Sequence, residues 1–181
     1  MINGLPVNET RELILKVAER LFSSRGFSYV AFDENKIAHV PANLTLAEAA
    51  AVPLAALTAL QALRNKAQVQ AGERVLVYSA SGGVGSFAVQ NAKASGAHVT
   101  AVCSASNIGL VRNLGADEVI DYTRDDFRHK KGEYGMIFDV IGSYSLGQVR
   151  QALRPEGILV SVNPVRGNPL ARFVYKSVER D

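Results

Sequence analysis

Residues 73–85, which read E-R-V-L-V-Y-S-A-S-G-G-V-G, constrain the fold of this chain more than any other stretch. The apolar run 75–78 has the length and the β-branched and aromatic character of a strand buried on both faces, as in a parallel sheet. A glycine-rich turn follows, and residues 84–95 read as a helix that Gly96 ends. Strand, glycine turn and helix in this order are typical of the first unit of a dinucleotide-binding βαβ fold.

The turn itself is the predicted phosphate-binding loop. Gly82 lets the backbone approach a pyrophosphate, Gly85 lets the helix pack closely on the strand, and the free N–H groups at the helix start face the anion. Ala80 stands where the usual G-x-G-x-x-G motif has its first glycine, so an ordinary tight turn is the alternative. The strand and helix around it favour nucleotide binding. The predicted loop comprises Ala80, Ser81, Gly82, Gly83, Val84 and Gly85.

Composition narrows the class of protein. The chain has 181 residues, 48% of them hydrophobic and 20% charged, as in a soluble globular protein. The net charge of +3 is small and its basic residues are scattered, so we expect no nucleic-acid or membrane partner. Residues 48–63 are apolar, but we expect them to be too short to span a bilayer and to be interrupted by Pro53. Cys103 is the only cysteine, which predicts a cytoplasmic protein without disulfides or a multi-cysteine metal site.

Further helices and strands are predicted in alternation. We expect an amphipathic helix over 10–25, short strands over 28–32 and 36–40, a helix over 45–52 that begins with the capping box Thr45–Glu48, and a second helix over 54–66. Beyond the glycine turn, strands are expected over 97–103, 118–122, 134–141 and 157–163, and helices over 107–114 and 145–153. This alternation predicts an α/β fold with a doubly wound parallel sheet of Rossmann type, in strand order 3-2-1-4-5.

The residues after the second predicted strand bear on the choice of cofactor. An acidic residue there would bond the ribose 2′-hydroxyl of NAD, but no Asp or Glu lies between Glu73 and Asp117. The chain instead offers hydroxyl, amide and guanidinium groups, which suit a 2′-phosphate. We therefore predict NADP(H) in preference to NAD(H); the alternative is a neutral loop that accepts both. The residues concerned are Ser104, Ser106, Asn107 and Arg112.

Five motifs in order, over 52–63, 79–85, 114–122, 138–142 and 153–157, resemble the zinc-independent quinone oxidoreductases, the zeta-crystallin-like branch of the medium-chain dehydrogenases/reductases. The resemblance covers about 29–171. It implies hydride transfer between a nicotinamide cofactor and a quinone, enone or related carbonyl compound, without a metal. It also implies cofactor contacts at Tyr122, Val140 and Gly142. No catalytic acid or base is named, because in this family the hydride passes directly.

The chain departs from the family at both ends. The family's catalytic lobe is represented only by a remnant at 28–44, which follows a helical segment at 1–27. Residues 10–27 of that segment resemble the first helix of TetR-type repressors, although a simple packing helix is an equal interpretation. The expected dinucleotide-binding domain covers 45–170, and 171–181 form a tail.

The reduced catalytic lobe and the missing sixth strand lead to expectations about activity and oligomeric state. A truncated chain would bind cofactor and turn over little small-molecule substrate, and the alternative is a non-catalytic nucleotide-binding module or relic. With no sixth strand, the fifth strand would be an open edge, which predicts a homodimer or poor solubility.

Overall fold

The computed structural model describes residues 40–162 and 174–177. The chain divides into two compact units, Met1–Ala49 and Ala50–Asp181, and only 40–49 of the first are described. The helix expected over 10–25, with its resemblance to TetR-type repressors, lies outside the described residues. So do the strand expected over 28–32 and all but the last residue of the one expected over 36–40.

The predicted capping box is present at the start of the first described helix, α2 (Leu46–Leu60). Thr45 donates its backbone N–H and its hydroxyl to Glu48 Oε2, at 2.8 and 2.7 Å, and Glu48 N–H donates to Thr45 Oγ1 at 3.3 Å. Two donors at the helix start are thereby satisfied reciprocally, as the T-x-x-E spacing predicts.

Helix α2 does not stop at Pro53, so the prediction of two separate helices is wrong. Pro53 lies inside α2, which continues directly into a π-helical turn, η2 (Gln61–Lys66). Proline removes one backbone donor and crowds the preceding turn. Because Pro53 is on an exposed side of the helix, the carbonyl that loses its partner can bond to water. Buried Ala59, Ala62 and Leu63 hold the far end of the helix on the core.

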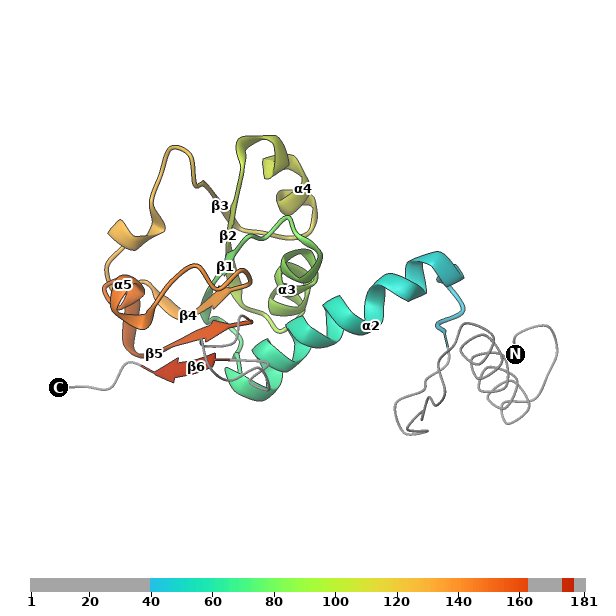
Figure 1. Cartoon of the computed structure of the whole chain (residues 1–181), viewed down its shortest axis with the longest axis horizontal. Helices are drawn as coiled ribbons and strands as arrows, with labels where there is room; N and C mark the ends of the chain where they lie inside the picture. Colours follow the sequence, from blue (N-terminus) through green and yellow to red (C-terminus); the bar gives the residue numbers. More distant parts are fainter. Residues whose placement is uncertain (1–39, 163–173, 178–181) are drawn as a thin grey trace, which may run out of the picture. The chain divides into compact units, whose positions relative to one another are not determined.

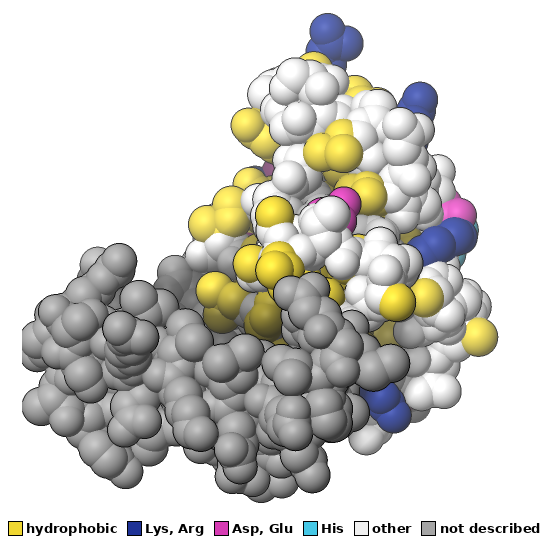
Figure 2. Space-filling model, turned by 90° about the vertical axis from the view of Figure 1, so that its right-hand side faces the viewer, with side chains coloured by type: hydrophobic (Ala, Val, Ile, Leu, Met, Phe, Trp, Pro, Cys, Tyr) yellow, Lys and Arg dark blue, Asp and Glu magenta, His cyan; other side chains and the backbone are white. Residues whose placement is uncertain are grey.

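The same continuity corrects the expectation that this apolar run is too short to span a bilayer. Leu46–Lys66 form one helical segment of 21 residues that is long and apolar enough to cross a membrane, by length and composition alone. Core helices of soluble proteins share that property. Several of its side chains are exposed, with Leu54 75% and Leu57 51% accessible. Figure 2 shows hydrophobic side chains at the surface of one face of the described chain.

The second unit is built on one twisted sheet (Figure 1). Its order is β3-β2-β1-β4-β5-β6, in which the first five strands are parallel and β6 is antiparallel to β5. The doubly wound α/β fold and the order 3-2-1-4-5 are confirmed. The strands are β1 (Arg74–Tyr78), β2 (His98–Cys103), β3 (Glu118–Asp121), β4 (Tyr134–Asp139), β5 (Leu153–Ser161) and β6 (Val174–Ser177).

Alternate residues of the buried strands point into two cores, one on each face of the sheet. Val75 and Val77 of β1 face the end of α2, α3 (Gly83–Ala94) and α4 (Ile108–Asn113), whereas Leu76 faces the opposite side. That side is covered by the short helices η4 (Phe127–His129) and α5 (Leu146–Val149). Both faces are thus apolar, as the continuous hydrophobic run of β1 predicts.

The structure corrects the prediction at the C-terminal side of the sheet. The helix expected over 145–153 is only the four residues of α5, because Leu153 is buried and pairs with Tyr134 as the first residue of β5. The exposed residues 154–156 bulge out of the ladder before Ile158 pairs with Met136. The open edge expected at the fifth strand is also wrong, since Ile158 pairs with Ser177 of β6.

Candidate nicotinamide-cofactor site

The turn after β1 lies at the edge where the parallel strands end, the carboxyl edge. Ser79 turns the chain with a φ of 62°, and the fully buried Ala80 donates its N–H to Val102 O on β2 at 3.0 Å. Gly82 N–H donates to Ser79 O at 3.2 Å, which closes the turn directly before α3. Gly82 is the N-cap of α3 and makes no side-chain cap. The first N–H groups of this helix are therefore available to an anion.

The three glycines of the turn differ in what the fold requires of them. A Cβ on Gly85 would overlap Ser79 O and the backbone of Ala80, so α3 packs on the turn only because Gly85 has no side chain. A Cβ on Gly82 would stand 3.5 Å from Ser79 O, an ordinary contact, and one on Gly83 would meet nothing within 4 Å. Close packing therefore explains why residue 85 is a glycine. Gly82 and Gly83 instead leave open space at the helix start, as a bound phosphate requires.

A polar cluster stands beside this turn, after the end of β2. Asn107 Nδ2 donates to both Ser81 Oγ and Ser104 Oγ, at 3.1 Å each, and Ser104 Oγ and Ser106 Oγ share a hydrogen bond of 3.0 Å. The short helix η3 (Ala105–Asn107) carries two of these residues and leads into α4. Ser81 of the predicted phosphate-binding loop is thus brought together with three residues predicted after the second strand, across 26 positions of the chain.

Two further predicted residues lie near this cluster in sequence but outside its hydrogen bonds. Arg112 is exposed in the last turn of α4, and within the described part of the chain its guanidinium makes no hydrogen bond or ion pair with the segment 104–107. Tyr122 follows β3, donates its N–H to Cys103 O at 3.2 Å, and is 56% exposed. Both side chains are exposed.

Cys103, the last residue of β2, is buried. Burial, together with the negative charge of Asp121, raises the pKa of the Cys103 thiol. Asp121 is the acidic group at the end of the neighbouring strand β3. Its carboxylate already accepts hydrogen bonds from the N–H and the hydroxyl of Thr123, at 3.0 and 2.9 Å.

The loop after β4 contains the remaining predicted residues, Val140 and Gly142. Val140 is half-buried against the core, and Gly142 has a φ of 78°, which favours glycine. Asp139, the last residue of β4, directly precedes this loop. Its side chain is fully buried, and its carboxylate accepts hydrogen bonds from three backbone N–H groups of this loop, so it fixes the backbone of the loop.

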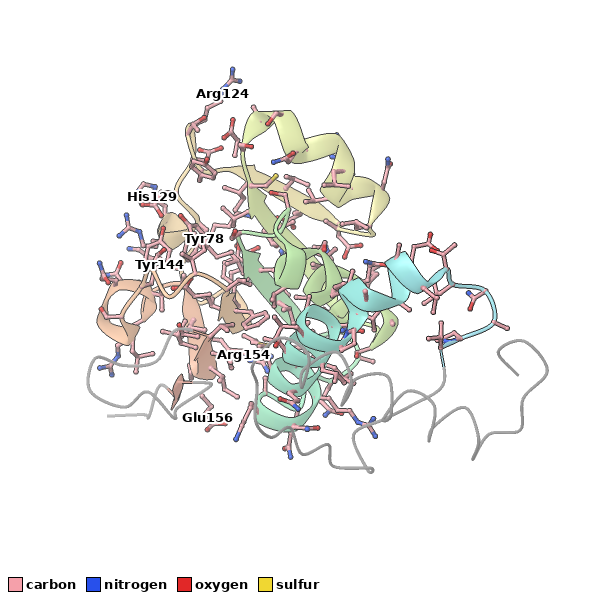
Figure 3. The ribbon with its side chains drawn as sticks, turned by 45° about the vertical axis from the view of Figure 1, so that its right-hand side comes forward. Tyr78, Arg124, His129, Tyr144, Arg154 and Glu156 are labelled. Carbon is pink, nitrogen blue, oxygen red and sulfur yellow. The ribbon has the colours of Figure 1, made fainter. Side chains whose placement is uncertain are left out.

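An aromatic cluster on the same edge was not predicted. The ring of Tyr144 packs edge-on against Tyr78 (Figure 3), with ring centroids 5.0 Å apart. It also packs edge-on against Phe127, with centroids 5.3 Å apart. Arg128 lies over the Tyr144 ring at 5.5 Å. Burial and the nearby Tyr78 hydroxyl raise the pKa of Tyr144. Nothing in the spacing of these residues along the sequence indicates this cluster, because its members come from the end of β1, from η4 and from the loop after β4.

Comparisons with known proteins place this architecture in a family. The family model described as zinc-binding dehydrogenase matches residues 83–177. A chloroplast envelope quinone oxidoreductase homolog of Arabidopsis thaliana is 49% identical over 144 residues, 75% of this chain and 43% of that protein. The mitochondrial NAD(P)H oxidoreductase RTN4IP1 of Mus musculus is 50% identical over 99 residues, 52% of this chain and 25% of that protein.

Solved structures of oxidoreductases resemble this chain as well. The quinone oxidoreductase from Coxiella burnetii superposes with a TM-score of 0.64 at 35% identity, over 69% of this chain and 39% of that one. A probable oxidoreductase from Mycobacterium abscessus gives a TM-score of 0.66 at 32% identity, over 76% of this chain and 45% of that one. The chain spans less than half the length of these relatives.

The zinc in the family description does not fit the described residues. In 40–162 and 174–177 no three His, Cys, Asp or Glu side chains come together as metal ligands, and the single cysteine is buried with its thiol pKa raised. The order of the strands, the glycine turn and the matched relatives all agree with membership of the dehydrogenase family. The chain belongs to the zinc-binding dehydrogenase family of medium-chain dehydrogenases/reductases, as a zinc-independent member similar to the quinone oxidoreductases.

Proposed function

We propose that this chain binds NADP(H) at the carboxyl edge of its sheet, and that hydride passes there between the nicotinamide and a quinone, enone or related carbonyl compound. The observation that carries the cofactor proposal is the Ser81–Ser104–Ser106–Asn107 cluster, beside the uncapped start of α3. The order of the strands reverses between β1 and β4, and ligands of doubly wound sheets bind at that point.

Each part of the site would hold a different part of the cofactor. The N–H groups at the start of α3, next to Gly82 and Gly83, would bind the pyrophosphate. The hydroxyls of Ser104 and Ser106, with exposed Arg112, would donate to the 2′-phosphate of the adenosine ribose. When bound, the nicotinamide supplies the hydride chemistry; the protein binds it, orients it and excludes water.

The substrate class is supported by the relatives. Besides the quinone oxidoreductase homolog of Arabidopsis thaliana, a 2-methylene-furan-3-one reductase of Solanum lycopersicum is 40% identical over 82% of this chain. An NADPH-dependent alkenal/one oxidoreductase of Arabidopsis thaliana is 35% identical over the same share. Quinones and conjugated ketones all accept hydride at an electron-poor carbon, which is the chemistry we propose for this chain.

Calorimetry tests the cofactor proposal. We expect the wild-type chain to bind NADPH at least about tenfold more tightly than NADH, because charge-assisted hydrogen bonds to the 2′-phosphate contribute roughly 1.4 kcal/mol or more. Ser104→Asp places a carboxylate beside that phosphate and should reverse the preference. Ser95→Asp, at the opposite end of α3, adds the same charge away from the site and should leave the preference unchanged. Equal affinities of the wild type for both cofactors would exclude the proposed 2′-phosphate site.

Turnover separates the enzyme from the alternative, a non-catalytic nucleotide-binding module. Hydride transfer requires the acceptor to be held close to the nicotinamide with water excluded. On this proposal, the residues described at the carboxyl edge would supply the cofactor side of that arrangement. We therefore expect the chain alone, mixed with NADPH and 1,4-benzoquinone, to oxidise NADPH well below about 1 per second, the low end of ordinary enzymes. Faster oxidation would show that the chain positions the acceptor as well.

A further inference from the structure

The buried carboxylate of Asp139 organises the whole loop that follows β4. Its Oδ1 accepts from Ile141 N–H at 3.2 Å and from Gly142 N–H at 2.9 Å, and its Oδ2 accepts from Tyr144 N–H at 2.7 Å. Asp139 is fully inaccessible to solvent. A charge buried to that extent is stable only when its lone pairs are satisfied, so the carboxylate and the loop fix each other.

Another aspartate at the carboxyl edge, Asp121, holds a shorter segment of chain than Asp139 does. The Asp121 carboxylate, at the end of β3, accepts one backbone N–H, that of Thr123, and its other contacts are with the side chains of Thr123 and Arg124, no more than three residues further along the chain. The bonds of Asp139 extend to Tyr144, five residues further along the chain. The chain thus closes around the Asp139 carboxylate, and the left-handed backbone of Gly142 lies inside that closed segment.

The loop is also fastened to the strand that carries the glycine turn. Tyr144, whose N–H is held by Asp139, packs its ring against Tyr78, the last residue of β1 (Figure 3). Residues 140–144 are therefore held at one end by the Asp139 carboxylate and at the other by aromatic contacts to Tyr78 and Phe127. We call residues 140–144 the Asp139 loop.

The position of this loop assigns it to one half of a dinucleotide. A cofactor whose pyrophosphate lies at the start of α3 and whose adenosine ribose lies at the Ser104–Asn107 cluster has its adenosine half over β2. Because β1 lies between β2 and β4, the other half then extends over the end of β4, where the Asp139 loop begins. On the cofactor proposal above, we infer that Asp139 is a positioning residue for the nicotinamide half, acting through the shape of this loop.

Two ligands test this assignment. The first, NADP⁺, contains both halves of the cofactor, and the second, 2′,5′-ADP, contains only the adenosine half with the phosphate on its 2′ position. Asp139→Asn replaces one acceptor oxygen by an NH₂ group and orphans at least one N–H of the loop. We expect it to weaken NADP⁺ binding about tenfold, the equivalent of one lost charge-assisted hydrogen bond, and 2′,5′-ADP binding less than twofold.

A second variant and a control distinguish a specific loss of cofactor binding from a general loss of stability. Gly142→Ala strains the same loop at its left-handed residue and leaves the buried carboxylate in place, and we expect the same selective loss of NADP⁺ affinity. Asp117→Asn removes a carboxylate that also accepts a backbone N–H, that of Val99, at the opposite edge of the sheet. It should leave both affinities unchanged. Retained 2′,5′-ADP binding reports that each variant is folded.

The fluorescence of bound NADPH provides a readout that general stability does not move, because it comes from the nicotinamide ring. We expect the emission of NADPH bound to Asp139→Asn to resemble that of free NADPH more than the wild-type complex does. If both loop variants weaken the two ligands by the same factor, or weaken neither, the assignment of Asp139 is overturned. If the wild-type chain binds neither ligand, it is the cofactor proposal that fails.

Discussion

Asn107 and Ser81 are joined by a hydrogen bond of 3.1 Å that ties the segment after β2 to the turn after β1. The same Asn107 amide nitrogen also donates to Ser104 Oγ at 3.1 Å. One side chain therefore sets the relative position of the two loops to which we assign the 2′-phosphate and the pyrophosphate. Neither loop alone would fix that distance.

We expect Asn107→Ala to weaken NADPH binding about threefold to tenfold, the equivalent of roughly one of its two hydrogen bonds at about 0.5–1.5 kcal/mol, because the two loops keep their other contacts. Calorimetric titration with NADPH measures the effect. Asn113→Ala, at the exposed end of α4, is the matched control and should bind as the wild type does. An unchanged affinity in Asn107→Ala would mean that the two loops hold their positions without this amide.

Two glycines of the turn should differ sharply in their effect on stability. Gly85→Ala places a methyl group inside the backbone of Ser79 and Ala80, and we expect it to lower the free energy of unfolding by about 3 kcal/mol. Gly83→Ala meets open space and should change it by less than about 1 kcal/mol. Urea denaturation of the two variants measures both values. Similar midpoints would contradict the close packing of α3 on the turn.

Gly82 should matter for binding and not for folding. Gly82→Val adds a side chain whose Cβ has ordinary contacts at 3.5 Å in the fold but whose methyl groups enter the space assigned to the pyrophosphate. We expect NADPH affinity to fall by more than about tenfold with little change in thermal unfolding. Gly147→Val, in α5 with nothing within 4 Å, is the control. Normal NADPH binding by Gly82→Val would remove the pyrophosphate from this turn.

The pH dependence of stability should report on Asp117, at the amino edge of the sheet. Burial by itself would raise the pKa of its carboxyl, but hydrogen bonds from Lys93 Nζ at 2.6 Å and Val99 N–H at 2.7 Å hold the pKa below its ordinary value of 3.8. A carboxyl whose pKa is lowered by folding stabilises the protein above its unfolded-state pKa. That contribution is lost as the pH falls through the folded-state pKa.

We therefore expect Asp117→Asn to cost about 1 kcal/mol at pH 7, a value reduced by solvent at this partly exposed site. The difference from the wild type should shrink as the pH falls below about 4 and vanish at still lower pH. Chemical denaturation at a series of pH values measures it, with exposed Asp125→Asn as the control. A difference that stays constant down to pH 2 would mean that the charge of Asp117 does not contribute.

The central part of the fold can be predicted from local sequence, because a strand buried on both faces is apolar at consecutive positions. Residues 75–78 are apolar at every position, and β1 contains them all. The positions of Ser104 and Asn107 follow in turn, since parallel strands end at one edge and their following loops meet there. The hydrogen bonds of that cluster confirm this for two loops that lie far apart in the sequence.

Other features of the fold depend on tertiary contacts, which local sequence patterns do not predict. Pro53 reads as a helix boundary, but the helix continues because its far end is buried on the sheet. Leu153 reads as the end of a helix, but its pairing with Tyr134 makes it part of a strand. The anchoring of the loop after β4 depends on one carboxylate, that of Asp139, whose burial is set by the neighbouring strands.

The pairing of Val75 with Met136 has a consequence for how the protein is made. The glycine turn directly after β1 leaves the ribosome well before β4 exists, since those two residues are separated by roughly 60 positions, or about 3–12 s of synthesis. Until then one side of β1 has no partner, and the cofactor has only half of its crevice. On the cofactor proposal, NADPH would therefore stabilise the completed domain but would not guide the folding of the first half of the nascent chain.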